Sequence, residues 1–274
     1  AVAALASDPA LDEQRAGMSR DALTDLALRL LRFSLASHHA GGGACTDGAP
    51  WGHTWISALG VERMMHAVDA LAPALTDADR AALRRMLVSE SDWLLDAHQV
   101  VAGLVEDNVP EANLWNGAVL HRTALLYPHE PRAAAYRDKG SRFLANAISV
   151  PADATSDAVL DGRAVRSWHV GPQFFESYAL NHHRYLNVGY MVICLSNAAM
   201  LHFAFRARGA DAPQALYHHV ADLWRLVKAC TFPDGRLCRI GGDTRVRYCY
   251  CQDYAIPTWL LAAEVLGDAD APAF

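Results

Sequence analysis

Residues 181–195 read N-H-H-R-Y-L-N-V-G-Y-M-V-I-C-L, a polar and aromatic segment that leads directly into an apolar one. Two histidines, two asparagines, an arginine and two tyrosines precede a run that is typical of a buried helix. An ordinary surface loop would carry Glu, Lys, Ser and Gly instead. Binding and catalytic groups are concentrated in loops that a rigid scaffold holds. The stretch therefore predicts a buried helix whose N-terminal end carries a functional loop.

Around this stretch the chain has helical periodicity nearly throughout. Between residues 19 and 39, apolar side chains recur with the spacing of one helix face, and the glycines at 41–43 end that helix. Thr76 and Asp79 form a capping-box pattern at the start of a helix that reaches about residue 98. Pro110 suits the first position of a helix that reaches residue 127. Further helices are expected at residues 54–71, 130–148, 187–208, 213–231 and 254–266.

Strand signals are scarce, and the fold class follows from the helices. Residues 236–251 alternate well enough for a short hairpin or an extended loop, and both stay open. Helices of about 15–20 residues, joined by alternately short and long loops, predict an all-α fold of stacked antiparallel helix pairs. Such pairs build a bundle, a solenoid or a closed α/α toroid. Their long polar loops would gather at one end, where we expect the site, and we treat residues 1–274 as a single domain.

Composition and charge exclude several classes of protein. The 274 residues are 52% apolar and 20% charged, which allows a sizeable core and argues against disorder. The net charge of -6 argues against nucleic-acid binding, and it requires a local basic patch for any anionic ligand. No uninterrupted apolar run reaches the length of about 20 residues that spans a bilayer, so we expect no membrane partner. The compartment stays open, since a mature secreted chain also lacks the basic start of a signal peptide. The oligomeric state stays open as well.

Metal-binding patterns are weak. The six cysteines have no zinc-finger spacing, and residues 249–251 form a C-x-C rather than a C-x-x-C, which indicates semi-buried free thiols. Three His-His pairs occur, at 38–39, 182–183 and 218–219. His218 and Asp222 have helical i, i+4 spacing, but neither an H-E-x-x-H motif nor a carboxylate-rich set accompanies them. We therefore expect no metal and no cofactor.

Three stretches contain candidate functional residues. In P-E-A-N-L-W-N-G, residues 110–117, Asn113 lies in the first turn of a predicted helix. If Asn187 caps the next buried helix, Tyr190 also lies in a first turn, and His182 and His183 lie in the loop before it. Residues 236–248 contain four arginines and one aspartate, so their local charge is +3.

These residue types fit one kind of chemistry. Amides, guanidinium groups and helix N-termini bind carboxylates. Histidine accepts a proton near neutral pH, and tyrosine donates one to a leaving oxygen. A carboxylate clamp with a base and an acid suits abstraction of the proton next to a carboxylate. In a uronic acid that proton is on C5, and O4 leaves by β-elimination, for which neutralising the carboxylate is the main electrostatic task.

The spacing of the histidines and the tyrosine sets a condition. On one continuous helix, His183 and Tyr190 would be two turns and about 10 Å apart, too far to serve one sugar ring. The hypothesis therefore requires the helix to begin after His183, as the cap-like Asn187 indicates.

The order of these motifs resembles that of the α/α-toroid polysaccharide lyases. Asn113-Leu114-Trp115, the 182–190 segment and Arg245-Val246-Arg247-Tyr248 occur in the same order as in the chondroitin AC and hyaluronate lyases, which have heparinase II/III-like and alginate lyase relatives. The resemblance covers about residues 51–254. It implies a toroid, complete or incomplete, that acts on an anionic polysaccharide without a cofactor. The catalytic residues that it implies are Asn113, His182, His183 and Tyr190, and the substrate-binding residues are Trp115, Asn181, Arg245, Arg247 and Tyr248. Trp51, like Trp115, would suit stacking on a sugar ring and is a further substrate-binding candidate.

Within this resemblance, the roles of individual residues stay open. The spacings of eight residues from His182 to Tyr190 and seven from His183 are shorter than in the hyaluronate lyases. Asn181-His182 is also similar to the Asn-His pair of the alginate and heparinase-like lyases, in which the tyrosine comes from a later segment. Tyr248 or Tyr250 would then be the acid. Those families carry a C-terminal β-domain, so this chain is expected to be a fragment or a minimal toroid.

Three other functions stay open. A uronyl C5-epimerase would use nearly the same groups. An α/α-barrel glycoside hydrolase needs two carboxylates that flank the bond, and a helical scaffold that binds a partner would need no catalytic residues. The candidate carboxylates for a hydrolase are Asp107, Glu111, Asp161 and Asp253. The sequence does not decide which uronate is bound, whether cleavage is endo or exo, or which histidine is the base.

Overall fold

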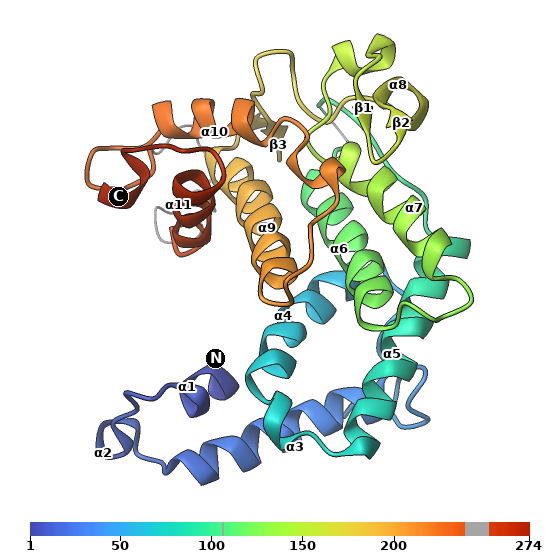
Figure 1. Ribbon diagram of the computed structural model, residues 1–274, viewed down its shortest axis with the longest axis vertical. Coiled ribbons are helices and arrows are strands. Elements are labelled where there is room, and N and C mark those ends of the chain that lie inside the picture. The colour runs from blue at the N-terminus through green and yellow to red at the C-terminus, as the bar shows by residue number, and fades with distance from the viewer. Residues whose placement is uncertain (106, 239–251) are drawn as a thin grey trace. The chain divides into compact units, whose positions relative to one another are not determined.

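The computed structural model describes residues 1–105, 107–238 and 252–274. These residues are mostly helical, with only four strands of two residues each (Figure 1). The prediction of an all-α fold is therefore confirmed. The chain divides into two compact units, which we describe separately: unit 1 comprises residues 1–98 and 119–136, and unit 2 comprises residues 99–118 and 137–274.

Unit 1 is built from helices only. Its elements are α1 (Val2–Ser7), α2 (Glu13–Ala16), α3 (Arg20–Ser37), α4 (Ser57–Ala70), the 3-10 turn η1 (Ala72–Ala74), α5 (Asp77–Asp96) and the second half of α6 (Pro110–Leu126). Helix α3 packs against α1, α4 and α5. The core contains fully buried side chains such as Met65, Leu87 and Leu94.

Local capping fixes the start of α5. The hydroxyl of Thr76 accepts the backbone N–H of Asp79, and the Asp79 carboxylate accepts the N–H of Thr76, which confirms the predicted capping box. The same carboxylate receives two hydrogen bonds from the guanidinium of Arg32 on α3, at 2.8 and 2.9 Å. One aspartate thus begins α5 and ties it to α3.

Unit 2 contains the remaining helices and both hairpins. Its elements are the first half of α6, most of α7 (Ala133–Ala145), η2 (Pro151–Thr155), β1 (Val159–Leu160), β2 (Arg163–Ala164), α8 (Val165–Trp168), β3 (Asn181–His182), β4 (Tyr185–Leu186), α9 (Val188–Arg206), η3 (Gln214–Tyr217), α10 (Val220–Ala229), α11 (Ala255–Glu264) and η4 (Ala271–Ala273). Strand β1 pairs with β2, and β3 pairs with β4, both antiparallel.

Helix α9 forms the core of unit 2, and α10 and α11 pack against it (Figure 1). It is long and apolar enough to cross a membrane by length and composition alone. However, 78% of its apolar window is buried inside the protein, as is usual for a core helix. The buried helix predicted after the 181–190 stretch is therefore present.

One predicted helix is divided in the structure. Residues 213–231 form the 3-10 turn η3 and then α10, because His219 between them has a left-handed backbone conformation with φ of 57°. A helix cannot continue through such a residue. The hairpin or loop considered for residues 236–251 lies mostly outside the described residues.

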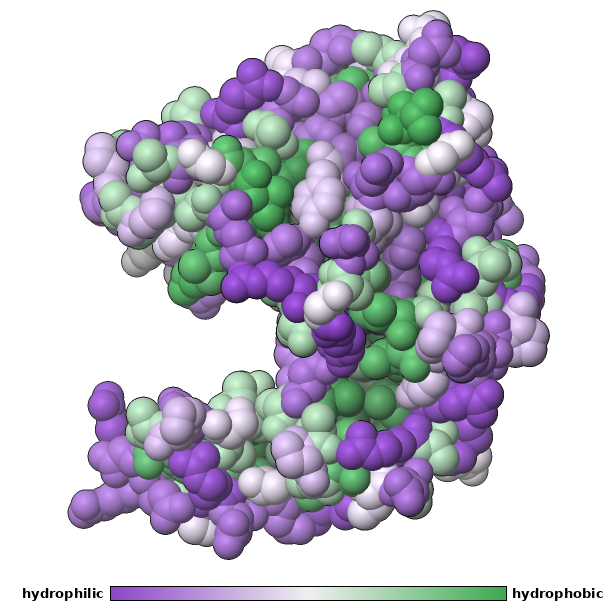
Figure 2. Space-filling view, viewed as in Figure 1, coloured by the Kyte–Doolittle hydropathy of each residue, from purple (hydrophilic) through white to green (hydrophobic). Residues whose placement is uncertain are grey.

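The surface of unit 2 has an apolar area on α11. Ile256, Leu260 and Val265 are exposed, and the first two are one helical turn apart. Figure 2 shows hydrophobic surface in this part of unit 2. None of the predicted site residues lies on α11.

Candidate functional site

The β3–β4 hairpin positions the two histidines. His182 ends β3 and pairs with Tyr185 of β4, so His183 and Arg184 form a two-residue turn. Both turn residues have positive φ, 59° and 70°, the conformation of a type I′ hairpin turn. Gly and Asn are the usual residues there, and bulky side chains in this conformation are strained. Such strain is concentrated at functional sites.

Helix α9 begins directly after this hairpin. Asn187 is its N-cap, and the side-chain oxygen of Asn187 accepts the backbone N–H of Tyr190 at 3.1 Å. This confirms the predicted cap and meets the condition that the helix begin after His183. Tyr190 lies in the first helical turn, where it faces back toward the hairpin.

The rings of the hairpin and the helix converge. Nε2 of His183 lies 3.3 Å from the hydroxyl of Tyr190. The ring of His182 lies 4.1 Å from that of Tyr190 and 4.2 Å from that of His183, measured between centroids. His182 is buried, His183 is exposed and Tyr190 is half-buried. The two imidazoles and the phenol thus form a single cluster, in which His183 faces solvent.

Asn108 fixes the protonation of His182. The amide nitrogen of Asn108 donates to the backbone carbonyls of Leu104 and Asn181, so its oxygen must be the acceptor toward His182. That oxygen lies 2.6 Å from Nδ1 of His182, which therefore carries the hydrogen. In neutral His182 the lone pair is then on Nε2, the atom that can accept a proton.

Glu111 lies beside this lone pair. Its Oε1 is 3.8 Å from Nε2 of His182, and its Oε2 is buried with no hydrogen-bond partner among the described residues. Burial raises the pKa of Glu111 to about 7, because little in its surroundings compensates for the lost hydration of the carboxylate. Near neutral pH this carboxyl is therefore poised between its acid and base forms. Such shifts are common at catalytic carboxyls.

The structure places the three other predicted residues of unit 2 in different settings. Asn113 is 1% exposed, and its amide nitrogen donates to the backbone carbonyls of Val101 and Asn146. Both of its N–H groups are therefore engaged in this conformation. Trp115 is buried, one turn along α6 from Glu111, and its Nε1 has no partner among the described residues. Asn181 on β3 has a buried, unpartnered side-chain oxygen within that same set of residues.

The remaining predicted residues lie elsewhere. Trp51 belongs to unit 1, where its Nε1 donates to the carbonyl of Ser34 at 2.7 Å and its ring packs against His38. Arg245, Arg247 and Tyr248 lie outside the described residues, as does Tyr250. The described parts of the chain thus bring together His182, His183 and Tyr190 from the predicted set.

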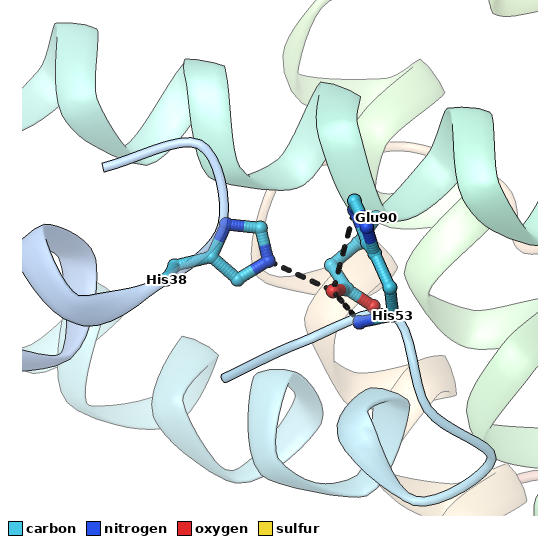
Figure 3. Close-up of side chains that lie close together, drawn as sticks. All are labelled: His38, His53 and Glu90. Carbon is cyan, nitrogen blue, oxygen red and sulfur yellow. Dashed lines mark hydrogen bonds and ion pairs between the residues drawn. The ribbon is translucent and has the colours of Figure 1, made fainter. Parts of the chain in front are cut away.

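Unit 1 contains a separate cluster of two histidines and a glutamate (Figure 3). Oε1 of Glu90 lies 2.8 Å from Nε2 of His38 and accepts the backbone N–H of His53 at 2.7 Å, and Oε2 lies 2.8 Å from the hydroxyl of Ser57. Although burial opposes ionisation, these donors hold the pKa of Glu90 below its usual value. Glu90 is thus an ionised, fully hydrogen-bonded anchor.

The tautomer of His38 is unsuited to metal binding at this cluster. Its Nδ1 accepts the backbone N–H of Ala40 at 3.0 Å, so the ring hydrogen must be on Nε2, which faces Glu90. A metal on Nε2 would displace this hydrogen while Nδ1 still faced a donor. The backbone of Gly52, with φ of 109°, passes so close that a Cβ there would lie 2.4 Å from Nε2 of His38. We call this tightly packed cluster of His38, His53 and Glu90 the clamp, and we assign it a structural role.

A pocket of about 600 Å³ opens beside this clamp in unit 1. Arg84, Arg85, Asp92 and Asp96 line it together with Trp93. Arg84 pairs with Glu130, and both aspartates pair with Arg132. The charges around the pocket are therefore balanced, and they do not select an anionic sugar.

Unit 2 contains a second cluster, formed by Asp153, His218 and His219. Nε2 of His218 lies 3.1 Å from Oδ2 of Asp153, and Nε2 of His219 lies 3.0 Å from Oδ1. Nδ1 of His219 lies 3.1 Å from Oδ2 of Asp222. Burial alone would lower the pKa of His219, but the two carboxylates raise it above its usual value.

Sequence reasoning missed two residues of these sites and gave a third a different role. Asn108, which orients His182, and Asp153, which contacts both histidines of the 218–219 pair, belong to no motif. Glu111 was considered only as a hydrolase carboxylate. The sequence held one signal that Glu111 belongs to the site. Glu111 is four residues before the predicted binding residue Trp115, which places both on one face of α6.

In comparisons with known proteins, no family model, no curated protein and no solved structure matches this chain.

Proposed function

We propose that this chain is the catalytic part of an α/α-toroid polysaccharide lyase, which cleaves a uronate-containing polysaccharide by β-elimination. The observation that carries the proposal is the convergence of His182, His183 and Tyr190, with 3.3 Å between Nε2 of His183 and the Tyr190 hydroxyl. Closure of the helix pairs into a toroid is part of the proposal. Its supports are the all-α content and the motif order, which is similar to that of the lyases.

In the proposed reaction, Nε2 of His182 removes the C5 proton of the uronate. The electrons of the C5–H bond form the C4–C5 double bond, and the bond from C4 to O4 breaks. The hydroxyl of Tyr190 protonates O4 as it leaves. His183 hydrogen-bonds this hydroxyl and orients it. Base and acid are both positioned side chains, each of which typically contributes about 10²–10⁴-fold to the rate.

The uronate carboxylate must be neutralised as C5 loses its proton. We assign part of this role to Glu111 in its protonated form and to Nε1 of Trp115. Both are on one face of α6, and both have a buried polar atom without a partner among the described residues. A ligand that pairs such atoms gains most of a hydrogen bond's energy, because leaving them unpaired is costly. Arg245 and Arg247 are the proposed cationic contributors.

A glycoside hydrolase is the second candidate, because a carboxyl with a pKa of about 7 suits a general acid. That reaction also needs a second carboxylate across the bond. Asp161 is already engaged, since its oxygens accept from the hydroxyl of Ser141 and the backbone N–H of Gln214. The lyase reaction gives a role to His182, His183 and Tyr190, whereas hydrolysis would use only the Glu111 carboxyl.

A product assay tests the proposal. The protein is incubated with glucuronan, hyaluronan, chondroitin, heparosan or alginate, and the ultraviolet absorbance of the new C4–C5 double bond is followed. We expect absorbance to rise with at least one of them, and to rise about 10²–10⁴-fold more slowly in His182→Ala and Tyr190→Phe. His129→Ala, at an exposed histidine of unit 1, is the matched control and should keep full activity.

The other outcomes are equally distinct. New reducing ends without the absorbance would show hydrolysis and favour the second candidate. If neither signal appears on any polyuronate, the proposed activity is wrong.

A further inference from the structure

The geometry points to a second site in unit 2: Asp153, His218 and His219 bind a divalent transition-metal ion of the zinc type. This metal site is independent of the proposed lyase activity. It unites a carboxylate from the 3-10 turn η2 with two imidazoles from the junction between η3 and α10. Two imidazoles and one carboxylate are a frequent protein ligand set for zinc.

The ligand atoms already have suitable spacing. Nε2 of His218 lies 3.1 Å from Oδ2 of Asp153, and Nε2 of His219 lies 3.0 Å from Oδ1. One ligand atom from each of the three residues lies within 4.8 Å of the others. Around tetrahedral zinc, with ligands at about 2.0–2.1 Å, neighbouring ligand atoms are about 3.3 Å apart. The two imidazoles face different oxygens of Asp153, so the ligand atoms would close from separations within 4.8 Å onto one ion.

The partners of the ligands also suit a metal. Oδ2 of Asp222 lies 3.1 Å from Nδ1 of His219, the nitrogen that must carry the hydrogen when Nε2 binds the ion. Ligating histidines almost always donate their other N–H in this way, to a carboxylate or carbonyl. The carboxylate of Asp153 is held by the backbone N–H of Val150, at 3.0 Å. A ligand that is oriented before binding loses less entropy on binding.

Burial gives the site a structural character. The side chain of Asp153 is 4% exposed, that of His218 9% and that of His219 19%. The hydroxyl of Tyr178 lies 3.1 Å from Nδ1 of His219, and Tyr178 is in the segment that leads into β3. An ion here would fasten η2, α10 and this segment together.

The clamp in unit 1 provides an internal control. It also contains two histidines and a carboxylate with closely spaced ligand atoms. However, His38 presents a protonated Nε2 to Glu90, because its Nδ1 faces a backbone donor. His219 instead presents Nε2 to the carboxylate while Nδ1 faces an acceptor. Nδ1 of His219 can therefore keep its hydrogen when Nε2 binds an ion, whereas Nδ1 of His38 cannot.

Metal content is the first test. The full chain is stripped with EDTA, dialysed against zinc chloride and then against metal-free buffer, and its zinc is measured by mass spectrometry. We expect about one bound zinc per folded chain, and loss of it in Asp153→Asn and His218→Gln, with His53→Ala unchanged. Folding of each variant is checked by circular dichroism. Wild-type protein that is folded and holds no stoichiometric zinc would overturn the proposal, as would loss of zinc in His53→Ala alone.

Cobalt substitution tests the identity of the ligands without any variant. Co²⁺ bound by imidazole and carboxylate should give visible d–d bands without a thiolate-to-cobalt charge-transfer band, whereas binding by the cysteines would give that band and contradict the assignment. Asp222→Asn keeps all three ligands and removes only the negative charge beside Nδ1 of His219, so this variant is used if the ligand variants do not fold. We expect it to weaken zinc binding about 10–100-fold, and an unchanged affinity would contradict the assignment.

Discussion

Two buried glutamates, Glu90 in unit 1 and Glu111 in unit 2, each lie next to histidine, yet their pKa values are shifted in opposite directions. The carboxylate of Glu90 lies within hydrogen-bonding distance of an imidazole nitrogen, a hydroxyl and a backbone N–H, and its pKa is lowered. Glu111 has an oxygen without a partner among the described residues, and burial raises its pKa to about 7. The comparison teaches that burial near a histidine does not by itself set the pKa of a carboxyl. The number of hydrogen-bond donors that reach the carboxylate decides whether its pKa is lowered or raised.

The same reasoning separates the two His–carboxylate clusters. In the unit 1 clamp, every polar atom of Glu90 and His38 that we describe faces a protein partner of the right kind. In unit 2, His218 and His219 share the two oxygens of one aspartate, and a second aspartate orients His219. The first arrangement stabilises the fold, and the second is suited to an ion.

The largest expected effect is that of Glu90→Ala. It leaves Nε2 of His38 and the backbone N–H of His53 without their acceptor, and each buried unpaired group costs about 1–3 kcal/mol. We expect the free energy of unfolding to fall by about 4 kcal/mol, measured by urea denaturation. Added zinc should not restore it. If Glu90→Ala is as stable as the wild type, the clamp is not structural.

Glu111 should make the free energy of unfolding depend on pH. Its pKa is raised from 4.5 to about 7 on folding, so the folded chain binds more protons than the unfolded chain between these values. Stability is therefore greatest below about pH 4.5 for this group and is lost as the pH rises to about 7. At about 1.4 kcal/mol per pKa unit, the contribution is about 3 kcal/mol.

Glu111→Gln is the variant that tests this pH dependence. It should remove most of the decline in the free energy of unfolding between pH 4.5 and 7, and should be more stable than the wild type above pH 7. Equal slopes for the two proteins would show that Glu111 has an ordinary pKa.

Zinc should stabilise the wild type by a somewhat smaller amount. A ligand at about 100 times its dissociation constant adds about 2.7 kcal/mol when it binds only the folded state. We expect this gain in thermal or urea denaturation of the wild type and of His53→Ala, and not in Asp153→Asn. A gain of equal size in Asp153→Asn would place the zinc elsewhere.

The smallest effect is expected at the start of α9. Asn187→Ala removes the cap that accepts the N–H of Tyr190, at a typical cost of about 1 kcal/mol. Because Tyr190 is in the first turn, Asn187→Ala should also reduce the proposed lyase activity, whereas Thr76→Ala at the start of α5 should reduce the free energy of unfolding alone. Equal activity of the two variants would show that the cap does not position the tyrosine.

Much of the fold could be read from local sequence. The capping box of Thr76 and Asp79, the first helical position of Pro110 and the cap of Asn187 were all predicted, because each depends on residues within a few positions of one another. The division at His219 was not predicted, since a histidine carries no sequence signal for a left-handed backbone. Toroid closure and the functions of the arginines stay predictions.

The sequence by itself determined most of the helices, that α9 is a buried helix, and that a histidine-rich loop precedes it. Only the tertiary structure decided the state of the individual side chains. The hydrogen on His182 is fixed by Asn108, 74 positions away, and the partner of His218 is Asp153, 65 positions away. Helical periodicity is a property of neighbouring residues, whereas tautomers and pKa values depend on whatever donors and acceptors the fold places within about 3 Å.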